Sequence, residues 1–248
     1  MIVINRGVDV NSGDSGKTIQ DRVDAVWERI ARAAETSGRS ADEITLIAVG
    51  KTHPPARLIP AIEAGIRHFG ENRIQEAENK IPELSGHDLT WHMVGHLQRN
   101  KARTAINLFH TLHSLDSKRL ARRLQRQLDK EGVENYPTLI QVNASGEKSK
   151  YGIEPDDLEP LLDVITEECT HLEVRGLMTI APWTDDETVL RKTFRTLRRL
   201  SEDIDDKQYK NVTMNSLSMG MTNDYQIAIQ EGATHLRIGR AIFGERQQ

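Results

Sequence analysis

A lysine stands directly after the first strongly apolar segment of the chain. Residues 44–50 have the composition of a buried strand, and Lys51 follows at once. Burial at the end of such a strand would remove Lys51 partly from water, and desolvation favours the neutral amine, the form that attacks an aldehyde. A solvated lysine at the start of a loop is the ordinary alternative. Lys51 alone is therefore weak evidence for a reactive amine.

Two segments near the C-terminus resemble an anion-binding site. Residues 217–222 and 235–240 each end a strand-like run and each contain a glycine, Gly220 and Gly239. Glycines after a strand let an anion approach the backbone N–H groups at the start of a helix. These two segments predict a phosphate site.

Arg237 lies within the second of these segments. Strand alternation over residues 234–239 places His235, Arg237 and Gly239 on one face, and Leu236 and Ile238 on the other. An arginine that points into a protein interior needs a partner, because an unpaired buried charge is costly. A structural salt bridge would supply that partner, and so would a ligand.

A reactive lysine, a phosphate cradle and an inward arginine together predict one ligand, pyridoxal 5′-phosphate. Its aldehyde suits the lysine, its phosphate suits the cradle, and its ring nitrogen can accept a hydrogen bond from the arginine. The sequence therefore predicts a site for this cofactor.

The elements that would position these residues alternate between strands and helices. Helical patterns lie between eight strand-like segments, which favours parallel strands joined by crossover helices. The chain has 248 residues, which fits a closed (β/α)8 TIM-type barrel with about 250 residues. The predicted strands are 44–50, 66–70, 89–95, 109–115, 138–144, 173–180, 213–219 and 234–239; the predicted helices are 55–63, 75–81, 117–130, 156–168, 185–203 and 224–231.

One barrel domain is expected, over residues 18–248, after a loosely ordered segment 1–17. An extra N-terminal helix is predicted over residues 19–36, because apolar residues recur there at three- and four-residue spacing.

Composition excludes several classes of protein. Hydrophobic residues make up 37% and charged residues 28% of the chain, which is typical of a globular protein. The net charge of −4 gives no electrostatic reason to expect nucleic acid or a membrane surface as a partner. The single cysteine, Cys169, excludes an internal disulfide and a cysteine-based zinc site. We expect a cytoplasmic protein, monomeric, with a dimer as the alternative.

Two other kinds of site have partial support. His92 and His96 have the spacing of a metal-binding pair, but a strand context spoils the helical geometry that such a pair uses, so no metal is expected. Residues 11–18 match a P-loop except that Asn11 replaces the first glycine, and residues 45–52 match except for Thr45. A nucleotide-binding protein is therefore a distant alternative.

A series of ordered motifs resembles the pyridoxal phosphate homeostasis protein family. The resemblance runs from about residue 20 to residue 244. Its motifs are AVGKTHP (48–54), FGENRIQE (69–76), WHMVGHLQRNK (91–101), HSLDS (113–117), QVNASGE (141–147) with Lys150 and Gly152, GLMTI (176–180), LSMGMT (217–222) with Asp224, and RIGRAIFG (237–244).

The resemblance implies a barrel similar to the alanine racemase N-terminal domain, with pyridoxal 5′-phosphate as its cofactor. It implies that Lys51 forms the Schiff base and that Arg237 faces the ring nitrogen. By the same resemblance, Ser218, Met219, Gly239 and Arg240 would contact the phosphate, and Asn72, His92 and Met178 would surround the ring.

The sequence departs from the family pattern on both sides of the lysine. Gly50 replaces a frequent serine, and His53 replaces a frequent second lysine. The second departure puts in doubt any auxiliary role of that lysine in cofactor transfer. Whether Lys101 or Lys150 forms a second cofactor site stays open.

A carrier is favoured over an enzyme. Racemisation needs acid/base groups on both faces of the bound cofactor, and the chain ends at Gln248 without an added domain to supply the second group. Arg237 at the ring nitrogen would also weaken the electron sink of the cofactor. We therefore expect reversible storage and delivery of pyridoxal 5′-phosphate to apo-enzymes. A weak pyridoxal-dependent racemase, or another pyridoxal enzyme, is the alternative.

Overall fold

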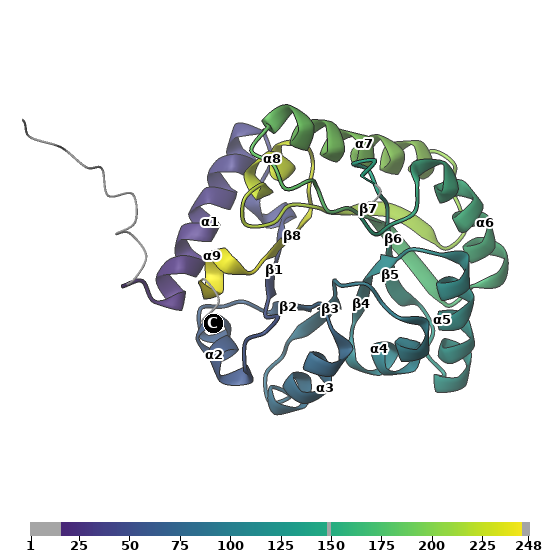
Figure 1. Cartoon of the computed structure of the whole chain (residues 1–248), viewed down its shortest axis with the longest axis horizontal. Helices are drawn as coiled ribbons and strands as arrows, with labels where there is room; N and C mark the ends of the chain where they lie inside the picture. Colours follow the sequence, from purple (N-terminus) through teal and green to yellow (C-terminus); the bar gives the residue numbers. More distant parts are fainter. Residues whose placement is uncertain (1–15, 148–149, 245–248) are drawn as a thin grey trace, which may run out of the picture.

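The computed structural model describes residues 16–147 and 150–244 (Figure 1). Most of the segment 1–17 that is expected to be loosely ordered, and most of the P-loop-like stretch 11–18, lie outside these residues. Thr18 is described, and it caps a helix: its side-chain oxygen accepts a hydrogen bond from the amide of Asp21 at 3.1 Å. Within the described residues, no helix has the length and apolar character that a membrane crossing requires.

Eight parallel strands form a closed barrel, in which each strand pairs with its neighbours in sequence and β1 pairs with β8. The strands are β1 (Thr45–Val49), β2 (His68–Glu71), β3 (Thr90–Met93), β4 (Thr111–Leu115), β5 (Tyr136–Gln141), β6 (Leu172–Met178), β7 (Val212–Ser218) and β8 (His235–Ile238). The predicted (β/α)8 fold is confirmed.

Helices surround the barrel, as Figure 1 shows in the view down the shortest axis of the molecule. They are α1 (Ile19–Thr36), α2 (Pro55–Glu63), α3 (Ile74–Glu83), α4 (Ala102–Leu108), α5 (Lys118–Glu131), α6 (Leu158–Glu168), α7 (Glu187–Asp205), α8 (Tyr225–Gln230) and α9 (Arg240–Phe243). The extra N-terminal helix α1 packs against α8 and α9, next to the last strand.

The predicted elements are confirmed, with small errors at their ends. The bounds of α1 and α2 agree with the prediction. Helices α4 and α9 were not predicted, because their seven and four residues are too few to show a helical period. Strand β5 begins two residues before the predicted start and ends at Gln141; beyond it, Val142 forms an isolated bridge with Ile153. The P-loop interpretation of residues 45–52 is wrong, because the residues that would form the loop are strand β1.

Strand alternation separates a barrel interior that contains polar and charged side chains from an apolar outer layer. Leu236 and Ile238 of β8 belong to the core between strands and helices, whereas Arg237 bonds across the interior to β7. Ile47 of β1 pairs in register with His68 and Arg237, so it shares their inward face. The predicted two faces of β8 are confirmed.

Candidate functional site

Lys51 follows β1 at the carboxyl end of the barrel. Ile47 faces the interior, and alternation carried forward through Val49 brings Lys51 to the barrel mouth, where its residue is half-buried. The carboxyl ends of parallel barrel strands are where such folds assemble their sites. Lys51 therefore lies just beyond β1, at the end of the barrel where the sequence analysis expects a site.

The turn that carries Lys51 is held on both sides. The amide of Gly50 donates to the Gly70 carbonyl at 3.0 Å, and the amide of Thr52 donates to the Glu76 carboxylate of α3 at 2.6 Å. Thr52 has φ of 68°, a left-handed conformation that a β-branched residue adopts only under constraint. The bond to Glu76 is part of that constraint.

A buried ion pair lies directly behind this turn. Lys80 of α3 and Glu71 at the end of β2 are in contact, and both side chains are buried. Lys80 also donates to the Gly50 carbonyl at 2.7 Å. A Cβ atom on Gly50 would lie 3.1 Å from the Glu71 Oε1 atom, so glycine here leaves room for the carboxylate. The pair could not be predicted from the sequence, because an acid on a strand and a lysine nine residues later on a helix carry no local signal.

Arg237 is buried inside the barrel on β8, the strand that pairs with β1. Its Nη1 atom donates to the Ser218 hydroxyl at 2.7 Å, and its Nη2 atom donates to the Thr179 carbonyl at 2.7 Å. Burial lowers the pKa of Arg237 to about 10, with Asp224 opposing the shift, so the guanidinium is charged at neutral pH. These two bonds use two of the five N–H donors that a guanidinium has, which leaves donors for a further acceptor.

The two glycine turns lie beside Lys51 and Arg237. Gly220 has φ of 96°, and a Cβ atom there would lie 2.7 Å from the Ala228 side chain. A Cβ atom on Gly239 would lie 3.1 Å from the Val49 carbonyl. Neither turn accepts a larger residue without a shift of its neighbours, so glycine is required at both positions for close packing.

The remaining predicted phosphate contacts differ in what they offer. The Met219 side chain is buried in the outer core, and its amide donates to the His235 carbonyl at 3.2 Å. Arg240 lies at the rim, where it donates to Asn223 at 2.6 Å and stands over the exposed ring of Trp183. A cationic hollow of about 250 Å³ adjoins Arg240, lined also by Lys17, Arg22, Arg29 and Thr222.

The predicted ring contacts come from three other strands. Asn72 follows β2, and its Oδ1 atom is buried without a hydrogen-bond partner among the described residues. Met178 ends β6 and is fully buried. His92 of β3 lies inside the barrel, hydrogen-bonded to His68 at 3.0 Å and to His113 at 2.9 Å. An unpartnered buried oxygen at the mouth is the kind of group that a ligand satisfies.

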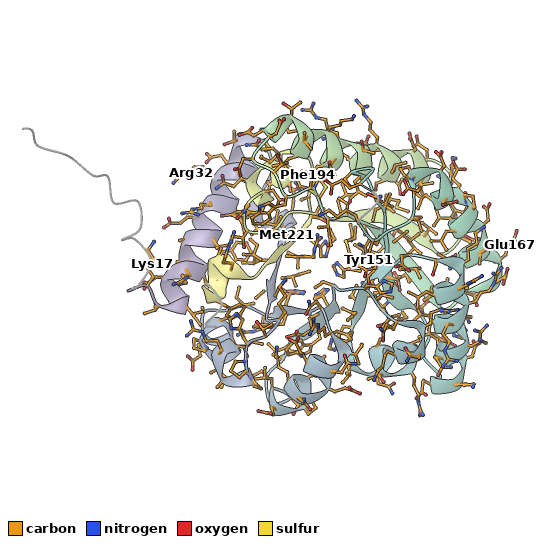
Figure 2. All side chains as sticks on the ribbon, viewed as in Figure 1. Lys17, Arg32, Tyr151, Glu167, Phe194 and Met221 are labelled. Carbon is orange, nitrogen blue, oxygen red and sulfur yellow. The ribbon has the colours of Figure 1, made fainter. Side chains whose placement is uncertain are left out.

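His92 and His96 have separate partners. The His96 ring lies 2.9 Å from the Asp116 carboxylate and stacks on the ring of Tyr151. Tyr151 lies over the middle of the ring of elements, as does Met221, whereas Arg32 and Glu167 lie at its outer edge (Figure 2). A hollow of about 620 Å³ beside His96 and Asp116 contains none of the predicted site residues.

Comparison with known proteins finds a family model and relatives that match nearly the whole chain. Residues 22–247 match the family described as alanine racemase, N-terminal domain. The pyridoxal phosphate homeostasis protein of Aquifex aeolicus is 40% identical over 227 residues, covering 92% of this chain and 98% of that protein.

Solved structures show the same architecture. PipY of Synechococcus elongatus is 36% identical, with a TM-score of 0.81 over 92% of this chain and 100% of that chain, and it has also been solved with pyridoxal phosphate bound. An alanine racemase of Clostridium difficile is 12% identical, with a TM-score of 0.68 over 90% of this chain and 57% of that chain. The racemase likeness concerns the fold alone.

Proposed function

Since this chain belongs to the pyridoxal phosphate homeostasis protein family, we propose that it binds pyridoxal 5′-phosphate reversibly at the barrel mouth and keeps the cofactor available to other proteins. The observation that carries the proposal is the placement of Lys51 and Arg237. Arg237 belongs to β8, Lys51 follows β1, and these two strands are adjacent and pair in register through Ile47 and Arg237. An amine and a fixed cation at one mouth suit a ligand with an aldehyde and an acceptor nitrogen.

The residues at the mouth fit this cofactor. When bound, pyridoxal 5′-phosphate supplies an aldehyde that condenses reversibly with a primary amine. Lys51 would hold that carbon, Arg237 would donate to the ring nitrogen, and Asn72 would accept a hydrogen bond from a ring substituent. The phosphate would lie at the turns that contain Gly220 and Gly239.

The fixed backbone of the turn that carries Lys51 supports reversible binding of the cofactor. Lys80 and Glu76 hold the backbone on either side of Lys51, through bonds to the Gly50 carbonyl and the Thr52 amide. A fixed backbone loses little freedom when the side chain engages a ligand, which favours binding. The site is complete in one barrel, because every proposed contact comes from this chain, so a monomer suffices.

Storage and delivery, rather than turnover, is the activity that Arg237 favours. A guanidinium charged at neutral pH keeps the facing ring nitrogen unprotonated, because two positive charges would then oppose each other. An unprotonated ring is a weak electron sink, and most amino-acid chemistry on this cofactor needs a strong one. Apo-enzymes that use the cofactor are the proposed recipients.

The test is to add pyridoxal 5′-phosphate to the purified chain, record the visible spectrum, reduce with borohydride and locate the added mass. We expect the wild type to become coloured and to carry the label on Lys51. Lys51→Ala should stay colourless, and Lys192→Ala, which removes an exposed lysine on α7, should behave as wild type. A colourless wild type would overturn the proposal, and a label on Lys101 or Lys150 would move the site.

Steady-state assays with a panel of amino acids address the enzymatic alternative. We expect racemisation no faster than that of the free cofactor. Substantial turnover that Lys51→Ala abolishes would replace the carrier by a pyridoxal-dependent enzyme.

A further inference from the structure

A chain of hydrogen bonds crosses the barrel interior and ends at Arg237. The His68 Nδ1 atom lies 3.0 Å from His92 Nε2, and His92 Nδ1 lies 2.9 Å from His113 Nε2. His113 Nδ1 lies 2.9 Å from the Ser218 hydroxyl, which also accepts from Arg237 at 2.7 Å. The chain thus connects strands β2, β3, β4, β7 and β8.

His68, at one end of this hydrogen-bonded chain, lies at the other end of the barrel from Lys51. His68 is the first residue of β2, at the amino ends of the strands, and it is partly exposed. Lys51 follows the last residue of β1, at the carboxyl ends. Because the strands are parallel, His68 faces the end of the barrel away from the proposed cofactor site.

The donors and acceptors in this chain must all run in one direction. A neutral imidazole has one donor nitrogen and one acceptor nitrogen, and both nitrogens of His92 and of His113 are engaged. Fixing the proton on one ring therefore fixes it on the next. Two arrangements are possible, one donating outward from Ser218 to His68 and one donating inward.

Ser218 selects between these arrangements. A guanidinium can only donate, so the Ser218 oxygen accepts from Arg237. In the outward arrangement Ser218 donates its hydrogen to His113, and each of the three rings carries its proton on Nε2. In the inward arrangement Ser218 accepts from both neighbours, and its own hydrogen has no acceptor among the described contacts. Ser218 is fully buried, so the outward arrangement is favoured.

The surroundings of the hydrogen-bonded chain keep its imidazole rings neutral. Burial is the main cause that places the pKa of His92 and of His113 well below the usual value, and neighbouring positive charge adds to it. The titratable or charged groups that face the rings from other elements are His235 and Arg237 of β8 and His110 before β4. Asp224 is the acid that faces Arg237.

We propose that His68, His92 and His113 are positioning residues for Arg237, and that they make its bond to Ser218 depend on protonation at the far end of the barrel. A cationic His68 donates from both nitrogens, which only the inward arrangement permits. The hydrogen-bonded chain then gains one proton, at His68. The protons of His92 and His113 move from Nε2 to Nδ1. Ser218 keeps its hydrogen but loses the acceptor for it, because His113 now donates. Ser218 must then turn, which weakens its hold on Arg237.

The first test reads the ring protons by nitrogen-15 NMR, on protein without cofactor, at about pH 7.5. We expect neutral rings with the proton on Nε2 at His68, His92 and His113. Ser218→Ala should remove this preference and give mixed tautomers, whereas Ser114→Ala, which changes a buried serine of β4 that bonds to the Gly95 carbonyl instead, should not. A cationic ring, or a proton on Nδ1 of His92 or His113 in the wild type, would overturn the proposal.

The second test rests on the proposed function and measures cofactor affinity at about pH 7.5 and about pH 5.5. When the pH is lowered between these two values, the cofactor affinity of the wild type should fall about three- to tenfold more than the affinity of His68→Gln. A difference of this size is what the loss of one hydrogen bond produces. His87→Gln, at an exposed histidine, should keep the wild-type profile. Equal profiles for wild type and His68→Gln would overturn the coupling. A wild type that binds no cofactor at either pH would instead contradict the proposed function, and the NMR result would still decide the tautomers.

Discussion

The Lys80 ammonium lies 2.7 Å from the carbonyl oxygen of Gly50, so a helix outside the barrel holds the residue that precedes Lys51. Lys80 also pairs with Glu71, and both side chains are buried. A buried charge pair is seldom a source of net stability, because desolvation offsets the attraction. Here the pair fixes the backbone that carries the proposed reactive amine.

Lys80→Met should destabilise the protein strongly. It leaves the buried Glu71 carboxylate without its cation, which typically costs about 3–5 kcal/mol. The measurement is the free energy of unfolding in urea, with Lys192→Met as the exposed control. The double variant Lys80→Met/Glu71→Leu should recover part of the loss, because no unpaired charge remains. A loss below about 1 kcal/mol for the single variant would contradict the buried pair.

Gly95→Ala should disturb the turn after β2. A Cβ atom on Gly95 would lie 2.2 Å from the backbone carbonyl oxygen of Asn72, a contact that only a backbone shift can relieve. We expect a loss of about 1–3 kcal/mol in the free energy of unfolding, with weaker cofactor binding because Asn72 moves. Gly86→Ala is the matched control, since its Cβ atom would meet nothing within 4 Å. Equal stability of the two variants would show that the turn is loosely packed.

Arg237→Lys should lose one of the two bonds that Arg237 makes across the interior. Its planar guanidinium reaches Ser218 and the Thr179 carbonyl together, and a single ammonium cannot keep that geometry. We expect about tenfold weaker cofactor binding by titration of the visible spectrum, equivalent to about 1.4 kcal/mol. Arg175→Lys, at an exposed position of β6, should leave binding unchanged. Wild-type binding by Arg237→Lys would argue against a ring-nitrogen contact.

Stability should fall with acid below about pH 6.5, the ordinary pKa of histidine in an unfolded chain. Burial lowers the pKa of His235 to about 4, and that of His92 and His113 lies well below the usual value. The unfolded chain therefore binds more protons than the native one in this range. The stability is fully present above about pH 6.5 and decreases as the pH falls toward the native pKa, by up to about 1.4 kcal/mol per pH unit for each such histidine.

The measurement for this pH dependence is urea unfolding at several pH values between about 7.5 and 4.5. His235→Gln should show a shallower decrease than wild type, because it removes one group that charges only on unfolding. His87→Gln, at an exposed histidine, is the matched control. Identical slopes for all three proteins would mean that His235 is already protonated in the native state.

The sequence by itself was sufficient to predict the barrel. Strand β1 is almost entirely apolar, and helix α1 repeats its apolar residues with helical spacing, so hydrophobic periodicity is enough to find both. The inward face of β8 followed from alternation alone, because a strand turns successive side chains to opposite faces. Lys51 was identifiable for the same reason, since it directly follows a buried strand.

Only the tertiary structure revealed what surrounds Lys51 and Arg237. The contact between Lys80 and Glu71, and the chain from His68 to Ser218, join residues that the closure of the barrel brings together. His113 lies 105 positions before Ser218, and no local pattern relates them. Local periodicity specifies which face a side chain takes, but the partner on that face depends on strand register and closure, which are properties of the whole sheet.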